Sequence, residues 1–209
     1  MFCRQMIAMM VAMLTLFPLT AYADARVTAA GALVDTMISD LEIFLATDTG
    51  DESARTAEID RVLNTYFDMD SITRFSAGQY WRAASSEQKT EYGSLFREVL
   101  CGKIVRNFDQ LQGLAYTADA ATAKGDKFVI VSGTFTDTTG QRPAVKVNWR
   151  VLTREGAAPK VFDIEIENLS LLVTQKQENV AVIRKNKGEF VALINAMKDR
   201  LANPVHNDS

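Results

Sequence analysis

Apolar residues recur every three to four positions in three segments of the first half of the chain, which is the period of an amphipathic helix. The first segment runs from Ala25 to Ala46, and the second ends near Tyr66 after a polar break at residues 47–53. The third carries apolar side chains as far as Leu111 and begins at the sequence SSEQ, residues 85–88, which is a capping-box signature. These patterns predict three helices, the third of them long.

After Gly113 the period changes to two, which is typical of strands. Residues 116–137 predict two strands joined at a turn at 124–126, and residues 144–153 and 161–167 predict a third and a fourth. On the third strand, four apolar residues alternate with polar ones, so that one face is apolar. On the fourth, Phe162, Ile164 and Ile166 are predicted to face away from the acidic residues between them. Two closing helices, at about 171–184 and 188–201, complete an α+β pattern: a twisted four-stranded antiparallel sheet packed by several α-helices.

The N-terminal residues are typical of a secretory signal peptide. A short segment with Arg4 precedes an apolar run from Met6 to Leu19, and the small-residue motif Ala21-Tyr22-Ala23 follows. The apolar run is short for a membrane span, although an uncleaved anchor is the alternative. We therefore expect a signal peptide at residues 1–23, one domain at 24–202 and a polar tail at 203–209.

Charge and composition exclude several classes of function. The predicted signal peptide carries Arg4 and no acid, so the net charge changes from −3 for the full chain to −4 for residues 24–209. A mildly acidic chain without a Lys/Arg cluster is a poor nucleic-acid binder. The single histidine, His206, lies in the polar tail, which argues against Ser-His-Asp and Cys-His catalysis and against zinc. Cys101 lies in an apolar helical pattern, which favours a buried thiol over a reactive one.

Two groups of carboxylates have competing interpretations. Asp68 and Asp70 form a D-x-D pair that could hold a divalent metal, but Asp68 also precedes a short apolar-periodic segment. We favour a helix cap there, because two carboxylates do not complete a calcium or magnesium shell.

The second group lies on one face of the fourth strand: Asp163, Glu165 and Glu167. Paired carboxylates are the machinery of a glycosidase, so a secreted carboxylate-dependent hydrolase is an alternative function. We favour the solvated face of an antiparallel sheet, with Lys146 and Arg150 pairing across strands.

The sequence offers many apolar side chains and few groups that could carry out catalysis or bind a metal. One sheet face is predicted to oppose the long aromatic-rich helix 85–111. Periodicity does not distinguish a filled core, as in an adaptor domain that binds no small molecule, from an apolar cavity.

Two blocks of the sequence resemble the MlaC/toluene-tolerance family, periplasmic phospholipid-binding proteins of the Mla lipid-transport system. The first block, FDMDSITRFSAGQYWRAASSEQ, matches the family pattern at these residues: Phe67, Asp68, Ile72, Gly78, Tyr80, Trp81, Arg82, Ala84, Ser85, Glu87 and Gln88. The second, KVFDIEIENLS and the helices after it, matches at Phe162, Asp163, Ile164, Glu167, Leu169, Ser170 and Gly188. The likeness covers about residues 27–201. The chain departs from the family pattern at Asn168, at residues 102–104 and at Asn179.

The resemblance implies a non-enzymatic carrier without a cofactor. Such a carrier would hold phospholipid acyl chains in an apolar cavity between sheet and helices. Its implied partners are an inner-membrane ABC transporter with an MCE-domain subunit and an outer-membrane lipoprotein-porin complex, and a hopanoid or other polycyclic lipid is an alternative cargo. We expect dry contact with the acyl chains from Phe96, Leu100, Ile104, Phe108, Val129, Val131, Phe135, Val147, Trp149, Val151, Ile164, Ile166, Leu169 and Leu171.

Overall fold

The computed structural model describes residues 19–204. Within this range the helices are α1 (Leu19–Thr47), α2 (Glu52–Tyr66), α3 (Met69–Ser76), η1 (Gly78–Arg82), α4 (Ser86–Arg106), η2 (Phe108–Leu111), α5 (Leu171–Lys185) and α6 (Val191–Ala202). None of them combines the length and apolar character that crossing a membrane requires. Most of the predicted signal peptide and of the polar tail, residues 1–18 and 205–209, lies outside the described residues.

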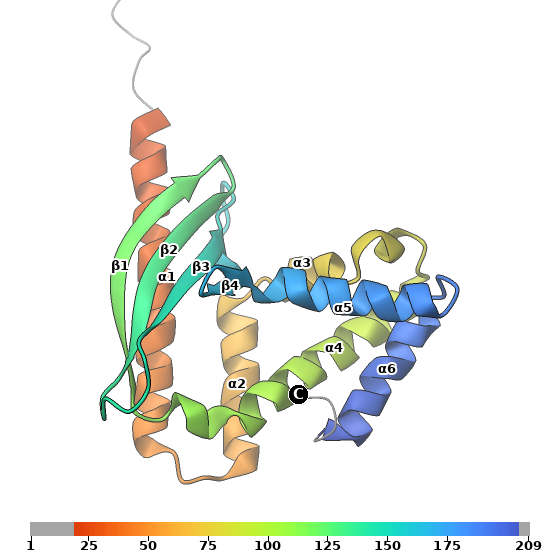
Figure 1. Ribbon diagram of the computed structural model, residues 1–209. Helices are drawn as coiled ribbons and strands as arrows, with labels where there is room; N and C mark the ends of the chain where they lie inside the picture. The colour runs from red at the N-terminus through yellow and green to blue at the C-terminus, as the bar shows by residue number, and fades with distance from the viewer. Residues whose placement is uncertain (1–18, 205–209) are drawn as a thin grey trace, which may run out of the picture.

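The strands form one antiparallel sheet. They are β1 (Leu114–Lys124), β2 (Phe128–Asp137), β3 (Val145–Leu152), β4 (Lys160–Ile166) and β5 (Leu169–Ser170), and their order in the sheet is their order in the chain. The curved sheet stands to one side of the helices α3 to α6 (Figure 1). The predicted α+β class with an antiparallel sheet is confirmed. The fifth strand was not predicted, because two residues are too short to show a period of two.

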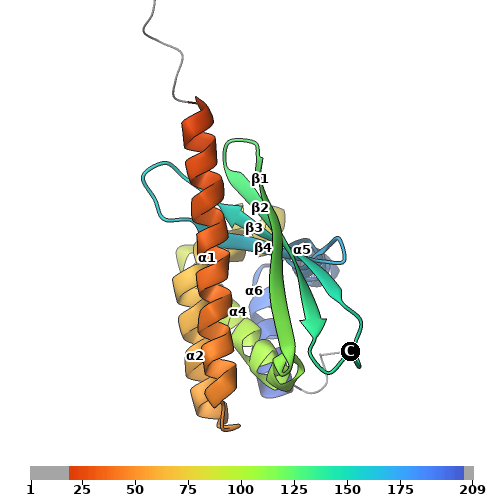
Figure 2. The ribbon, with the colours of Figure 1, turned by 90° about the vertical axis from the view of Figure 1, so that its left-hand side faces the viewer.

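Helix α1 covers the apolar face of the sheet. Its buried residues Ala30, Val34 and Met37 pack in one cluster with Val129, Val131, Val147, Trp149 and Val151 of the sheet. We call this cluster, with Phe135 and Ile164 packed against it, the sheet layer. Figure 2 shows α1 running alongside the sheet, with α2 next to it. The prediction that the long helix 85–111 opposes this face is wrong: α4 packs against α2 and α6 instead.

The remaining helices bury two further apolar clusters. One joins α3, α4, α5 and α6 around Tyr92, Phe96 and Leu193. The other joins α2 to the C-terminal end of α4 and to η2, around Ile59, Cys101 and Phe108. Because α4 contributes to both clusters, its apolar residues face other helices and not the sheet.

Local signals set the helix ends. The predicted capping box is confirmed: Ser85 Oγ accepts a hydrogen bond from Gln88 N at 3.2 Å, and Gln88 Oε1 accepts one from Ser85 N at 3.0 Å. The predicted long helix is interrupted at Asn107, where the backbone leaves helical geometry between α4 and η2. Helix α6 begins at Val191 and not at Gly188, because Gly188 has φ +85°, outside the right-handed helical region.

A β-bulge in β4 changes which of its side chains point toward the sheet layer. The register with β3 shifts between Arg150 and Val151, so that Val161 points into the sheet layer. Phe162 therefore turns toward the helices, where its ring packs edge-on to Phe75 with centroids 5.6 Å apart. The predicted grouping of Phe162 with Ile164 is wrong, because a bulge inserts one residue into the alternation.

Candidate functional site

The structure distributes the fourteen predicted lipid-contact residues among four places. Half of them meet in the sheet layer: Val129, Val131, Phe135, Val147, Trp149, Val151 and Ile164. They come from three adjacent strands and share one face, as the alternation predicted. This is the largest group that the fold brings together.

The predicted residues of the long helix lie elsewhere. Phe96 is buried among α3 to α6 with Leu100 packed against that cluster, while Phe108 is buried beside α2 with Ile104 at its edge. These four residues are separated from the sheet layer because α4 does not cover the sheet. Their contact with a lipid stays a prediction.

The last three predicted residues are exposed. Ile166, Leu169 and Leu171 lie at the end of β4, in β5 and at the start of α5, and Val173 beside them is exposed as well. We call these four residues the apolar tip. Ile166 pairs with Val147 of β3 and with Leu169 of β5, so the tip continues from the edge of the sheet layer.

Sequence reasoning missed several parts of the sheet layer, among them the α1 residues, Tyr116 and Val161. The α1 residues that wall it were recognised as a helical apolar stripe, but no sequence signal placed them against the sheet. Tyr116 of β1 was also missed. Its ring lies in an aromatic group with Phe135 and Trp149, at centroid distances of 5.2 Å and 6.4 Å.

The carboxylates of β4 are structural. Asp163 is only 4% exposed, so the predicted solvated face is wrong at this position. Its oxygens accept hydrogen bonds from Ser170 Oγ at 2.7 Å and Leu172 N at 3.1 Å, where α5 begins. Glu165 pairs with Arg150 at 2.5 Å, as predicted. Glu167 instead accepts from the backbone N–H of Lys146 at 2.8 Å.

Asp68 caps α3, as predicted. Its Oδ1 accepts from Ser71 N at 3.1 Å, and its Oδ2 forms an ion pair with Arg154 at 3.0 Å. The Asp68 N–H donates to Val161 O at 2.9 Å, which ties the start of α3 to β4. Within residues 19–204, no group of three or more His, Cys, Asp or Glu side chains is arranged to hold a metal ion.

Cys101 is buried, as predicted. Burial raises the pKa of its thiol, chiefly by desolvating the thiolate, and the nearby Asp60 acts in the same direction. A raised pKa lowers the thiolate fraction at neutral pH, so Cys101 is a packing residue in this fold.

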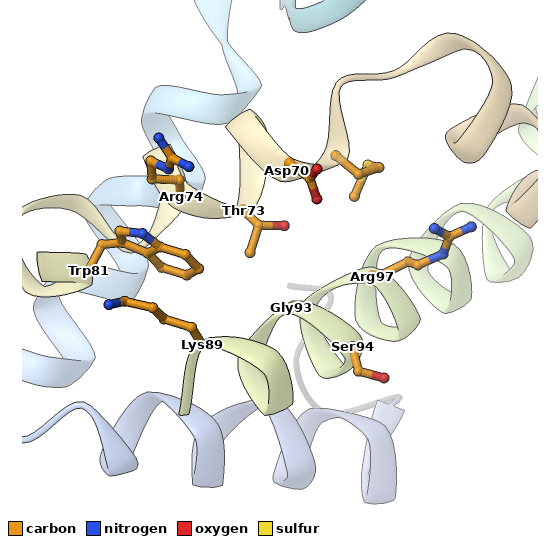
Figure 3. Close-up of a pocket in the computed structure, with 9 residues that line it drawn as sticks. Asp70, Thr73, Arg74, Trp81, Lys89, Gly93, Ser94 and Arg97 are labelled. Carbon is orange, nitrogen blue, oxygen red and sulfur yellow. The ribbon is translucent and has the colours of Figure 1, made fainter. Parts of the chain in front are cut away.

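A pocket of about 400 Å³ with both charged and apolar side chains in its walls lies between α3 and α4. Trp81, Lys89 and Arg74 lie at one end and Arg97 at the other, with Thr73 and Asp70 of α3 between them (Figure 3). The Arg97 side chain is held by Asp60 at 2.7 Å. None of the fourteen predicted residues lines this pocket, and its charged walls suit a polar group better than an acyl chain.

The comparison with known proteins identifies the family. A family model described as MlaC protein matches residues 32–199. This chain belongs to the MlaC family. MlaC proteins are periplasmic, non-enzymatic lipid-binding carriers, so the predicted resemblance and the prediction that the chain is not an enzyme are confirmed, and the hydrolase alternative is set aside. No curated protein matches the chain.

A solved structure with the same fold carries a lipid. It is the phospholipid-binding protein of Ralstonia solanacearum in complex with a phospholipid, which is 25% identical to this MlaC-family chain. The match has a TM-score of 0.69 and covers 83% of this chain and 97% of the Ralstonia chain. The similarity therefore extends over nearly all of that protein.

Proposed function

We propose that this protein is a periplasmic carrier that holds phospholipid acyl chains in an apolar cavity and shuttles the lipid between membranes. The observation that carries the proposal is the similarity, over 83% of the chain, to a protein that binds a phospholipid. Membership of a periplasmic family supports export by a signal peptide at residues 1–23 and a lipid-binding domain at 24–202.

The sheet layer is our proposed place for the acyl chains. It offers a continuous wall of valine, isoleucine and aromatic side chains on one sheet face. Each buried methylene of an acyl chain contributes about 0.8 kcal/mol, so two chains bind without a catalytic or charged residue. Val129, Val131 and Val151 are buried in this layer and α1 packs on the sheet, so a lipid enters the layer only if α1 moves away from the sheet.

The proposed partners follow from the role of the family. One is an inner-membrane ABC transporter with an MCE-domain subunit, and the other is an outer-membrane lipoprotein-porin complex. In this arrangement the carrier maintains the lipid asymmetry of the outer membrane. The apolar tip is our proposed route by which acyl chains reach the sheet layer, because it is exposed and joins the layer through Ile166.

Mass spectrometry of the organic extract of the purified protein tests the proposal. We expect stoichiometric glycerophospholipid, from cells or after incubation with phospholipid vesicles. Stoichiometric hopanoid would support the carrier function but show that the cargo is a polycyclic lipid. An extract that stays empty after the incubation would contradict the carrier function and favour an adaptor domain with a filled core.

A further inference from the structure

Two polar atoms lie buried in the sheet layer without a hydrogen-bond partner among the described residues: Tyr116 Oη and Trp149 Nε1. Trp149 is only 6% exposed. A third buried atom without a hydrogen bond, Asp68 Oδ2, is compensated by its ion pair with Arg154. Within residues 19–204, the phenol and the indole are therefore the buried side-chain polar groups that form neither a well-aligned hydrogen bond nor an ion pair, although the indole lies close enough to the phenol to lower its pKa.

The fold places the two groups together. Tyr116 on β1 and Trp149 on β3 stand on the same face of the sheet with β2 between them, and their ring centroids are 6.4 Å apart. Gly133 on β2 makes this possible, because a Cβ at that position would lie 2.3 Å from Tyr116 Oη. The phenol thus lies over the glycine and extends across β2 toward β3.

The apolar surroundings of Tyr116 and Trp149 make it unusual that their O–H and N–H groups lack hydrogen-bond partners. Buried tyrosine and tryptophan normally pair their O–H and N–H groups, because an unpaired buried donor loses its hydration without compensation. Here the neighbours are Phe135 and the apolar residues of α1 and of the strands. Burial raises the pKa of the Tyr116 phenol, a side-chain hydrogen-bond interaction with the Trp149 indole partly opposes the rise, and the charges of Asp35 and Asp119 add to it. At neutral pH the phenol therefore keeps the proton that it would donate.

We propose that Tyr116 Oη and Trp149 Nε1 donate hydrogen bonds to a carbonyl oxygen of the bound lipid, the ester that joins an acyl chain to glycerol. The inference rests on the proposed carrier function and specifies its ligand. An indole is only a donor and a protonated phenol can donate, so the matching group is an acceptor. An ester carbonyl is neutral, whereas a phosphate would bring a full charge whose burial is costly without a cation.

The proposed hydrogen bonds would distinguish classes of lipid that apolar contact alone does not distinguish. Burial of the acyl chains contributes the same binding free energy for ester-linked and ether-linked lipids, because their chains are the same. Two donors aimed at a carbonyl favour the ester, and they give no advantage to a polycyclic hydrocarbon. The Tyr116–Trp149 pair would thus act as a specificity filter for ester-linked glycerolipids.

The test is a competition between two probes that differ only in the linkage. The full-length chain is expressed with its own export signal, purified, stripped of lipid and incubated with vesicles of equimolar dioleoyl phosphatidylglycerol and its diether analogue. Mass spectrometry gives the ratio of the two bound lipids. We expect the unmodified protein to favour the ester by roughly fivefold to 150-fold, the value of two net hydrogen bonds.

The double variant Tyr116→Phe/Trp149→Phe is expected to bind both lipids at a ratio near one. Any loss of packing affects both probes equally, because their chains and headgroups are the same, so the ratio isolates the donors. Tyr80→Phe, a tyrosine at the edge of the helical cluster around Tyr92, is the matched control and should keep the ester preference.

A second measurement separates a ligand contact from a structural one. Tyr116→Phe removes an unpartnered hydroxyl, so the melting temperature of the lipid-free protein should stay the same or rise. A lower melting temperature, equal binding of ester and ether by the unmodified protein, or an ester preference that persists in the double variant would each overturn the proposal. Failure of the unmodified protein to retain either lipid would instead overturn the carrier function, and the ester contact with it.

Discussion

Asn179 shows how a polar residue is accommodated in the apolar cluster of the helices. Its side chain is fully buried. Its Nδ2 donates to Tyr92 Oη at 3.0 Å, and Tyr92 Oη lies 2.6 Å from Ser76 Oγ. Gln175 Nε2 donates to Asn179 Oδ1 at 3.0 Å. A buried amide is tolerated because both of its polar atoms are paired.

Tyr92→Phe should lower the free energy of unfolding by about 1 to 2 kcal/mol, because Asn179 and Ser76 lose a shared partner in a buried site. The loss is moderate since Ser76 Oγ also donates to Thr73 O and Asn179 Nδ2 to Ser76 O. Chemical denaturation measures it, with Tyr80→Phe as the control. Equal stability of Tyr92→Phe and the unmodified protein would show that this network does not contribute.

Gly133→Ala should also destabilise the protein, by roughly 1 to 3 kcal/mol, because the new methyl group would overlap the Tyr116 ring. The ring has little room to move, since Phe135 and Trp149 flank it. Gly31→Ala on α1 is the control, because a Cβ there meets no atom within 4 Å. A Gly133→Ala variant as stable as this control would show that Tyr116 is free to move off the glycine.

At the scale of elements, the loop between β2 and β3 is organised by a single carboxylate. Asp137 accepts hydrogen bonds from Thr139 Oγ1 at 2.7 Å, Gln141 N at 2.9 Å and Arg142 N at 3.0 Å. The Thr139 hydroxyl and the Arg142 guanidinium hold the pKa of Asp137 well below its usual range. Arg142 in turn donates to Gln110 O and Gln112 O, which joins this loop to η2 and to the residue that follows it.

This arrangement predicts a pH-dependent contribution to stability. A carboxyl whose pKa is lower in the folded state stabilises the fold above its unfolded pKa, about 3.9, and the contribution is lost as the pH falls toward the folded value. Asp137→Asn should therefore lower the melting temperature at pH 7 and have a smaller effect near pH 3. Asp126→Asn, in the exposed turn between β1 and β2, is the control. An Asp137→Asn effect that is the same at both pH values would contradict the prediction.

On the scale of the whole molecule, the apolar tip contrasts with the rest of the surface. Leu169 is 61% exposed at the edge of the sheet, and Ile43 on α1 is 65% exposed far from the tip in sequence. Single exposed apolar residues such as Ile43 are normal, whereas neighbouring ones indicate a contact surface. These two residues therefore form a matched pair for testing the proposed lipid route.

Leu169→Asp should lower lipid retention about tenfold or more, because a leucine that an acyl chain covers contributes roughly 1.5–3 kcal/mol and a charge on the route opposes acyl chains. Ile43→Asp should leave retention unchanged. Both variants should fold, which circular dichroism checks, since both side chains are exposed. Equal retention by the two variants would exclude the tip as part of the lipid route. A charged substitution at Val147, by contrast, should unfold the protein, because that side chain is buried.

The sequence by itself determined the features that depend on neighbours a few residues apart. The helical and strand periods, the capping box at Ser85, the cap at Asp68 and the antiparallel order of the strands were all predicted because propensity and capping act locally. The apolar face of the sheet was predicted for the same reason. The two blocks of family residues were sufficient to recognise the MlaC family.

Only the tertiary structure decided which helix covers that face and which residues meet across it. Val34 and Val131 are about a hundred positions apart in the chain, and no local pattern distinguishes α1 from α4 as the partner of the sheet. The β-bulge at Phe162, the burial of Asp163 and the meeting of Tyr116 with Trp149 over Gly133 likewise depend on strand register and packing. One apolar side chain fits a periodic pattern as well as another, so the pattern does not show which apolar residues meet. Contacts between residues far apart in the chain determine the candidate site.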